Sequence, residues 1–184
     1  IGAGTMGASI AAHLANAGIS VTLLDIASKD GEKNKIVNSG WDACLKAKPA
    51  NLMSMDLKTL VKLGNLEDDF GAVAEADWIC EAIVENLKIK QALMVRIDEV
   101  RKANAIVSTN TSGIPIHAVA EGRSKEFKQH FLGMHFFNPP RYLKLLEVIP
   151  TEDTSKDVVE FISYFGGYRL GKGIVLCKDT PNFI

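Results

Sequence analysis

Two short apolar runs, 132–137 and 145–149, each carry one residue that could exchange a proton, His135 and Glu147. A carboxylate is rarely buried without a partner, because burying an isolated charge costs several kcal/mol. A turn with two prolines separates the runs and could bring them side by side as neighbouring strands. We therefore expect Glu147 to orient His135 and stabilise its charged form, which suits a general base working near neutral pH.

Taken singly, these two residues have simpler interpretations. A histidine in an apolar run is usually a hydrogen-bonded core residue, and a glutamate in a strand usually points to solvent. A hydride-transfer enzyme, however, needs a base that takes the alcohol proton as the hydride leaves for nicotinamide. The hypothesis that His135 and Glu147 form a pair is therefore the one that gives these residues a function.

The glycines Gly2, Gly4 and Gly7 form a G-x-G-x-x-G pattern, which also includes Thr5 and Met6. Such glycines permit a tight strand-to-helix turn and a close approach of the backbone to a pyrophosphate, which then meets the helix N-terminus.

Asp25 follows Gly7 by eighteen residues and ends a short apolar strand. An acid at this place can accept hydrogen bonds from the adenosine ribose. A 2′-phosphate would meet its negative charge, and no arginine follows directly, so NAD is favoured over NADP. The alternative is a glycine turn that binds nothing, with Asp25 as a strand-end cap.

A third polar segment, 108–113, directly follows another predicted core strand. It lies at the carboxyl end of that strand, where α/β sheets bind ligands. Asn110 and Ser112 could hold a substrate oxygen or the nicotinamide ribose. The alternative is an ordinary turn rich in serine, threonine and asparagine.

The composition excludes several classes of protein. The chain has 184 residues, 47% hydrophobic and 23% charged, with a formal net charge of −1. These values fit a globular domain and argue against a basic nucleic-acid-binding surface. No apolar run approaches the roughly 18 residues that span a bilayer. The three cysteines, Cys44, Cys80 and Cys177, are far apart, so we expect no disulfide and no metal site, a reducing cytosol, and small buried thiols.

The periodicity of apolar residues predicts alternating helices and strands. Helices are expected over about 6–17, 29–48, 87–102, 115–120 and 155–165, the last ending before two glycines. Strands are expected over 21–25, 77–84, 105–108, 132–137, 145–149 and within 168–176, while 51–66 is expected to hold a turn, a short helix and a short strand. This order predicts an α/β fold with a doubly wound, mainly parallel sheet. The tight connection 138–144 favours antiparallel neighbours near the C-terminal end.

Taken in this order, the motifs resemble the NAD-binding domain of the L-3-hydroxyacyl-CoA dehydrogenases of fatty-acid β-oxidation. The matching stretches are GAGTMG (2–7), CEAIVENLKIK (80–90), STNTSG (108–113), GMHFFNP (133–139), LLEVIP (145–150) and CKDTPNFI (177–184). The resemblance covers essentially the whole chain, 1–184. It implies a Rossmann-like domain with a helical arm and extra C-terminal strands.

The resemblance also implies a role for each matched residue. His135 would abstract the 3-hydroxyl proton, Glu147 would orient it, and Ser112 would hydrogen-bond the 3-oxygen of the substrate, with Asn110 nearby. The cofactor NAD would be bound by the residues Gly2, Gly4, Thr5, Met6, Gly7, Asp25, Glu85, Lys90, Asn110 and Asn138. For Glu85 and Lys90 the simpler alternative is a solvated pair at the start of a helix.

The sequence departs from the family pattern in three places. The family commonly has a second serine where this chain has Gly113. The lysine-rich segment 29–48 corresponds to the arm that touches CoA, but only Lys46 and Lys48 are candidate phosphate contacts, and a lysine run is usually a solvated face. Finally, the chain starts at Ile1 and stops at Ile184, so we expect the start of the first strand and a C-terminal helical domain to be missing.

The function implied is oxidation of (S)-3-hydroxyacyl-CoA to 3-oxoacyl-CoA by the longer protein. Two alternatives stay open, a 3-hydroxybutyryl-CoA dehydrogenase working reductively and a non-catalytic, crystallin-like protein that binds NADH. The resemblance implies an acyl-CoA substrate, no nucleic-acid or membrane partner, and either a homodimer through the missing domain or a multifunctional enzyme. A bacterial-type cytosol is expected, and the mitochondrial matrix is the second possibility.

Overall fold

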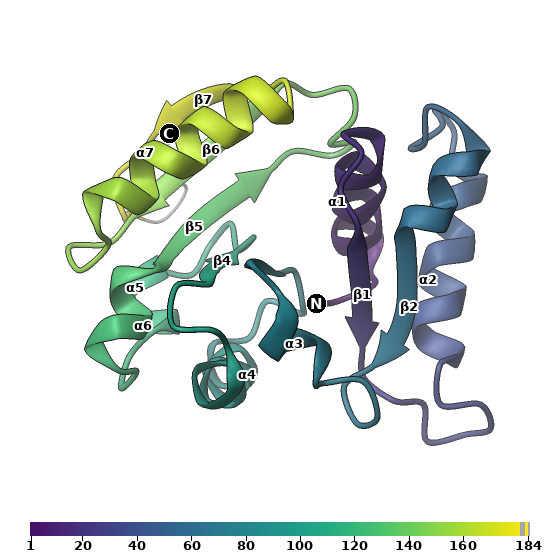
Figure 1. Cartoon of the computed structure of the whole chain (residues 1–184), viewed down its shortest axis with the longest axis horizontal. Helices are drawn as coiled ribbons and strands as arrows, with labels where there is room; N and C mark the ends of the chain where they lie inside the picture. The colour runs from purple at the N-terminus through teal and green to yellow at the C-terminus, as the bar shows by residue number, and fades with distance from the viewer. Residues whose placement is uncertain (181–182, 184) are drawn as a thin grey trace.

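The computed structural model describes residues 1–180 and 183, which form alternating helices and strands (Figure 1). The described helices are α1 (Thr5–Asn16), α2 (Lys35–Lys46), the 3₁₀ helix η1 (Met55–Leu60), α3 (Ala72–Glu75), α4 (Leu87–Val100), α5 (Ile116–Val119), α6 (Lys125–Gln129), α7 (Lys156–Tyr164) and the π-helical turn η2 (Phe165–Arg169). The strands are β1 (Val21–Asp25), β2 (Val61–Asn65), β3 (Trp78–Glu81), β4 (Ile106–Thr109), β5 (Phe131–Phe136), β6 (Leu145–Pro150) and β7 (Gly173–Leu176).

The strands form two groups of hydrogen-bonded neighbours. One group has the order β3-β4-β5-β6-β7 and the other is the pair β1-β2. All described pairings are parallel except β5 with β6, which run antiparallel. The prediction of a mainly parallel sheet with antiparallel neighbours across 138–144 is therefore confirmed.

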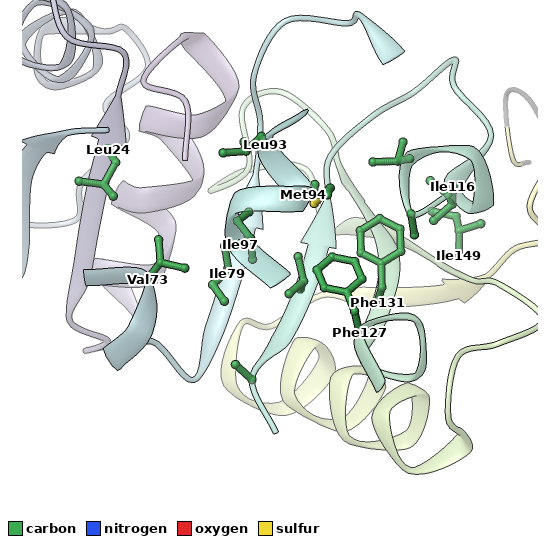
Figure 2. Packing of buried hydrophobic residues seen from close by; sticks show 14 of the residues in the cluster. Leu24, Val73, Ile79, Leu93, Met94, Ile97, Ile116, Phe127, Phe131 and Ile149 are labelled. Carbon is green, nitrogen blue, oxygen red and sulfur yellow. The ribbon is translucent and has the colours of Figure 1, made fainter. Parts of the chain in front are cut away.

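Helices cover both faces of the larger sheet. Because successive strand residues point to opposite faces, neighbouring residues of one strand pack against different helices. In β5, Phe131 packs with α4, α5 and α6 in one apolar cluster, which Figure 2 shows from close by. The next residue, Leu132, packs instead with α1 and α7 in a second cluster. The same alternation in β6 puts Ile149 in the first cluster and Val148 in the second. The sheet is thus doubly wound, as predicted.

A third apolar cluster joins α1 and α2 to the β1-β2 pair. The predicted arm helix is present but shorter than expected, covering Lys35–Lys46, and it buries Val37, Trp41 and Cys44. Gly40 lets α2 approach the glycine loop closely, since a Cβ atom there would lie 2.0 Å from the carbonyl oxygen of Ala3. The arm is therefore packed tightly against the segment that follows Ile1.

An apolar cleft of about 1130 Å³ separates β1 from β3, and we call it the β1–β3 cleft. Its walls include Leu23 of β1, Ile79 of β3 and Phe161 of α7. Ile1 and Gly2 bridge this cleft: Gly2 N–H donates to the Leu24 carbonyl (2.7 Å), while the Ile1 nitrogen donates to the Cys80 carbonyl (2.7 Å). The carboxyl ends of β1 and β3 are thereby held at the same edge of the fold.

Three details of the predicted elements differ in the structure. The strand expected over 77–84 stops at Glu81. There the buried Glu81 carboxylate accepts the backbone N–H of Ile83, and the chain leaves the sheet. The helix expected to end before Gly166 instead continues through both glycines as the π-helical turn η2. The short helices α3 and α6 were not predicted, because four or five residues are too few to show a helical period. No helix in the described part of the chain has both the length and the apolar character needed to cross a membrane.

Candidate active site

His135 and Glu147 lie directly opposite each other on the antiparallel strands β5 and β6. The distance between His135 Nδ1 and Glu147 Oε2 is 2.6 Å, and the Glu147 side chain is only 3% exposed. Both side chains share the face of the sheet that carries Phe131 and Ile149. The predicted pairing is therefore present, and the interpretation of Glu147 as a solvent-facing residue is wrong.

The pairing gives the two nitrogens of the imidazole different tasks. An ionised carboxylate accepts hydrogen bonds only, so the contact with Glu147 places a proton on Nδ1 of His135. Nε2 is then the basic nitrogen in the neutral ring. The rings of Phe137 and Phe183 flank the imidazole with centroids 4.7 and 6.0 Å away. The site thus holds a half-buried base between aromatic walls.

The proline turn between these strands is pinned by a buried lysine. Lys172 Nζ donates to the carbonyl oxygens of Pro140 and Leu143, the second at 2.9 Å. Burial lowers the pKa of Lys172 to about 8. On the other side of the turn, Arg141 donates to the carbonyl oxygens of Ala50 and Leu52, both at 2.8 Å. These contacts fix the strands that carry the His135–Glu147 pair and tie them to the segment after the arm helix.

Glu81, at the end of β3, anchors a fully buried ionic cluster. Its Oε1 accepts from Lys90 Nζ (2.7 Å) and from the backbone N–H of Ile83 (2.7 Å), and its Oε2 accepts from Thr109 Oγ1 (2.6 Å). Glu81 is 0% exposed and Lys90 is 1% exposed. The alternative of a solvated Glu85–Lys90 pair is therefore wrong for Lys90, whose charge lies in the interior and holds β3, β4 and α4 together.

Glu85 organises the polar loop that follows β4. Its Oε1 accepts from the Thr111 hydroxyl and from the backbone N–H groups of Ser112 (3.1 Å) and Gly113 (3.0 Å). Its Oε2 lies 3.5 Å from Lys90 Nζ. Burial acts to raise the pKa of this carboxyl, but the hydrogen bonds and the Lys90 charge outweigh it, and the pKa is lowered. An ionised Glu85 thus sets the conformation of the loop that presents Ser112.

The departure at Gly113 does not disturb this loop. A Cβ atom built there would meet only Glu85 Oε1, at an ordinary contact distance of 3.9 Å, and the backbone is not in the left-handed region. A serine would fit, so the loop geometry does not depend on glycine.

Asn110 links this loop to the strand that carries His135. Its Oδ1 accepts the backbone N–H of Phe136 at 2.8 Å, and its own N–H donates to the Glu81 carbonyl at 2.7 Å. The sheet register pairs Thr109 with Gly133, so residues 110–112 leave the sheet beside the end of β5. Ser112 and Asn138 are both exposed at this same edge. The structure therefore gathers these predicted residues at one end of the sheet, whereas the alternative of an ordinary turn does not explain the contacts of Asn110.

The glycine loop leads into the first turn of α1 as predicted. A Cβ atom on Gly7 would lie 1.8 Å from the carbonyl oxygen of Gly2, so only glycine permits this close packing. At Gly4 nothing lies within 4 Å of such an atom, so open space faces the helix N-terminus. Gly4 is the N-cap and offers no side-chain hydrogen bond to the first turn, in which Thr5 and Met6 lie. The backbone therefore forms the cradle that a pyrophosphate requires.

Asp25 caps the end of its strand, and this role leaves the predicted ribose contact open. Its Oδ2 accepts the backbone N–H of Ala3 (2.6 Å) and its Oδ1 accepts the N–H of Ile26 (2.6 Å), which is the expected role of a cap. The side chain is half-buried at the mouth of the glycine loop. Because a carboxylate offers about four acceptor directions, it can still receive ribose hydroxyls. Lys46 and Lys48 are exposed, and no hydrogen bond or ion pair within residues 1–180 and 183 joins either side chain to the edge of the sheet.

Several positioning residues were not singled out from the sequence. Four such residues hold the site together: Glu81, Thr111, Arg141 and Lys172. Each forms a hydrogen bond with a residue far away in the sequence, at a separation of up to 91 residues. For Glu81 a signal existed, since an acid inside an apolar strand suggests a buried partner. The others carried no local signal.

Comparison with known proteins agrees with this arrangement. Residues 1–180 match the family described as 3-hydroxyacyl-CoA dehydrogenase, NAD binding domain. The whole chain is 51% identical to a probable 3-hydroxyacyl-CoA dehydrogenase of Deinococcus radiodurans and covers 54% of that protein. It is 42% identical to a putative fatty acid oxidation complex trifunctional enzyme of Rickettsia felis, of which it covers 26%. Among solved structures, a 3-hydroxybutyryl-CoA dehydrogenase of Escherichia coli superimposes with a TM-score of 0.84 at 31% identity, covering all of this chain and 38% of the other. The chain thus spans about half the length, or less, of these three proteins.

Proposed function

Since this chain belongs to the 3-hydroxyacyl-CoA dehydrogenase family and forms its NAD-binding domain, we propose that the protein containing it oxidises (S)-3-hydroxyacyl-CoA to 3-oxoacyl-CoA. The single observation that carries the proposal is the His135–Glu147 pair, with 2.6 Å between Nδ1 and Oε2 at the ligand-binding edge of the sheet. A half-buried imidazole oriented by a buried carboxylate at this place is the base that alcohol oxidation requires.

The geometry supports a division of labour among the residues of this chain. Nε2 of His135 takes the proton of the 3-hydroxyl group, and Glu147 stabilises the imidazolium that forms. Ser112 hydrogen-bonds the 3-oxygen from a loop that Glu85 holds in place. When bound, NAD⁺ supplies the acceptor of the hydride from the substrate carbon. In the reverse direction the same imidazole returns the proton.

For cofactor binding, the open cradle at Gly4 and the free first turn of α1 fit a pyrophosphate. Asp25 would bind the adenosine ribose, while Glu85, Asn110 and Asn138 would line the ribose and nicotinamide end. Lys90 lies beneath Glu85, so we propose that it supports this end by fixing the charge and place of Glu85.

We propose that this chain is one domain of a longer protein. A parallel strand leading into Ile1 would fill the β1–β3 cleft, pairing with the free edges of β1 and β3. The length of the relatives supports a further segment after Ile184, which would complete the acyl-binding cleft and carry dimer contacts. The longer protein would be either a homodimer or a multifunctional enzyme, and the name of the Rickettsia relative, a trifunctional enzyme, supports the multifunctional arrangement. A cytosolic location is proposed from the bacterial relatives and the three free cysteines.

The test is NADH oxidation by the full-length protein with acetoacetyl-CoA, followed by the loss of NADH absorbance. Rapid oxidation is expected, and His135→Gln is expected to lower kcat by about two to four orders of magnitude with NADH affinity unchanged. A rate that survives the substitution would refute the role of His135. Bound NADH without turnover of acetoacetyl-CoA or any longer 3-oxoacyl-CoA would favour the non-catalytic alternative.

A reductive 3-hydroxybutyryl-CoA dehydrogenase is the second candidate, favoured by the likeness to the Escherichia coli structure of that name. The residues that catalyse the two directions are the same. Comparing kcat/KM for acetoacetyl-CoA and for 3-oxoacyl-CoA substrates of ten or more carbons distinguishes a short-chain enzyme from a general one.

A further inference from the structure

Glu147 has a second carboxylate oxygen that faces away from His135. Oε2 accepts from His135, whereas Oε1 lies 3.8 Å from Cys177 Sγ, within reach of a thiol donor. With a side chain only 3% exposed, Glu147 has little access to water. Within residues 1–180 and 183, the thiol of Cys177 makes the only hydrogen bond to Oε1. The same Sγ also lies 3.6 Å from the Val175 carbonyl oxygen, so two acceptors compete for the single thiol proton. A buried carboxylate oxygen needs a donor, and this need favours the contact with Glu147.

The sheet fixes the place of this thiol. Cys177 directly follows β7, and its backbone N–H donates to the Val148 carbonyl at 2.9 Å, continuing the pairing of β6 with β7. In that register Glu147 pairs with Val175, so Cys177, two residues further, lies on the same face as Glu147. His135, Glu147 and Cys177 thus lie on one face of the sheet, in a row that runs straight across from His135 to Glu147 and then diagonally to Cys177 at the end of β7.

Apart from Glu147, few charged groups surround this row. Among the described residues, the side-chain hydrogen bonds to the Glu147 carboxylate come from the His135 ring on β5 and from the Cys177 thiol at the end of β7. The acid nearest to Cys177 along the chain is Asp179, and its carboxylate is hydrogen-bonded to the backbone N–H and the ring of His117. No ion pair or hydrogen bond joins Glu147 to any other charged side chain in the described part of the chain.

We propose that Cys177 is a positioning residue of the reaction, whose thiol donates to Glu147 Oε1 and so holds the carboxylate that orients His135. The inference rests on the proposed function. A thiol is a weak donor, so it fixes the orientation of the carboxylate while leaving most of its negative charge for the imidazolium. This role differs from that of a small buried hydrophobic residue, which is what the sequence suggested for every cysteine.

The thiol is suited to donate rather than to react. Burial and, after it, the neighbouring charge of Glu147 raise the pKa of Cys177 above its ordinary value. At neutral pH the thiol therefore keeps its proton, and the thiolate needed for nucleophilic attack or oxidation is scarce.

The first test compares Cys177→Ala, Cys177→Ser and, as a matched control far from the site, Cys44→Ala in the full-length protein. In the oxidation of a 3-hydroxyacyl-CoA, where His135 acts as the base, Cys177→Ala is expected to lower kcat about threefold to tenfold. It should leave the KM for NAD⁺ unchanged and move the acidic limb of the pH–rate profile to higher pH. This direction follows because a carboxylate that has lost a donor binds the imidazolium proton more strongly. The hydroxyl of Cys177→Ser restores a donor, so the limb should return to the wild-type pH or below it. A purely structural role would scale the rate equally at every pH, and an unshifted limb in Cys177→Ala overturns the proposal.

The second test needs no turnover. Alkylation of Cys177 by iodoacetamide is followed by mass spectrometry in the wild type and in Glu147→Gln, with Cys44 and Cys80 as internal references. Removing the charge of Glu147 should lower the thiol pKa, so alkylation at about pH 8 should become at least about threefold faster at Cys177 alone. Equal rates would overturn the contact. An inactive wild type that still shows this coupling would refute the proposed function instead, so the two failures are distinguishable.

Discussion

The carboxylate of Asp25 accepts the backbone N–H of Ala3, with 2.6 Å between Oδ2 and the nitrogen. This hydrogen bond joins the end of β1 to the glycine loop, and the bond from Gly2 N–H to the Leu24 carbonyl runs beside it. The acid expected to recognise the ribose therefore also shapes the loop that meets the pyrophosphate. One side chain thus couples the two halves of the nucleotide site.

From this coupling, Asp25→Ala is expected to weaken NADH binding by about tenfold or more, since it loses the ribose contact and leaves the Ala3 N–H unpaired. It should also reduce the preference for NADH over NADPH, because the charge that repels a 2′-phosphate is gone. Fluorescence titration of both cofactors measures the two effects. Asp30→Ala, an exposed acid in the following loop, is the control. A preference for NADH that persists in Asp25→Ala would contradict the assignment of Asp25.

Gly4 and Gly7 are expected to fail in different ways when changed to alanine. At Gly7 the new Cβ would clash with the Gly2 carbonyl at 1.8 Å, so Gly7→Ala should destabilise the fold. At Gly4 the Cβ would enter open space, so Gly4→Ala should keep its melting temperature and instead block the approach of the pyrophosphate. Thermal unfolding and NADH titration, run on both variants, separate stability from binding. Unchanged NADH affinity in Gly4→Ala would show that the pyrophosphate lies elsewhere.

Much of the site could be predicted from sequence because its parts lie at the ends of strands with clear periodicity. His135 and Glu147 occupy runs whose register follows from a short turn, and the glycine loop has its own local pattern. The ionic cluster of Glu81 could not be predicted in the same way. Lys90 falls on an exposed-looking helix start, and only the packing of α4 against β3 and β4 shows that its charge is buried. Likewise, the contact of Cys177 with Glu147 depends on the pairing of β6 with β7, which no local signal announces.

The buried Glu81–Lys90 pair yields a third prediction. Glu81→Gln leaves the Lys90 ammonium without its closest carboxylate in a fully buried place, so the free energy of unfolding should fall by about 3–5 kcal/mol. The double variant Glu81→Gln/Lys90→Met removes the stranded charge and should recover part of that loss. Urea unfolding of both variants measures the difference. If adding Lys90→Met lowers the free energy of unfolding further, as an independent second substitution would, then the charge of Lys90 was not what destabilised Glu81→Gln.

His13 gives a prediction for acid conditions. It lies on α1 with Nε2 3.1 Å from the Leu170 carbonyl, while its buried Nδ1 has no hydrogen-bond partner in the described part of the chain. Burial, followed by the charge of Lys172, lowers its pKa from 6.5 to about 4. A ring whose pKa is lower in the folded state stabilises the fold fully above the unfolded value of 6.5, and this contribution is lost as the pH falls through about 4. The loss arises because the unfolded chain takes up the proton before the folded chain does.

The stability of the wild type should therefore fall more steeply between pH 6.5 and about 4 than that of His13→Gln, which cannot titrate there. Urea unfolding of the full-length protein, followed through the fluorescence of Trp41 and Trp78, measures both slopes. His130→Gln serves as the control, since this half-buried ring bonds only a neighbouring carbonyl oxygen, at 3.0 Å. The gap in unfolding free energy between the wild type and His13→Gln should shrink as the pH falls. A constant gap for His13→Gln would mean that the ring takes up its proton equally in the folded and unfolded states, and burial against Leu170 would then not affect its pKa.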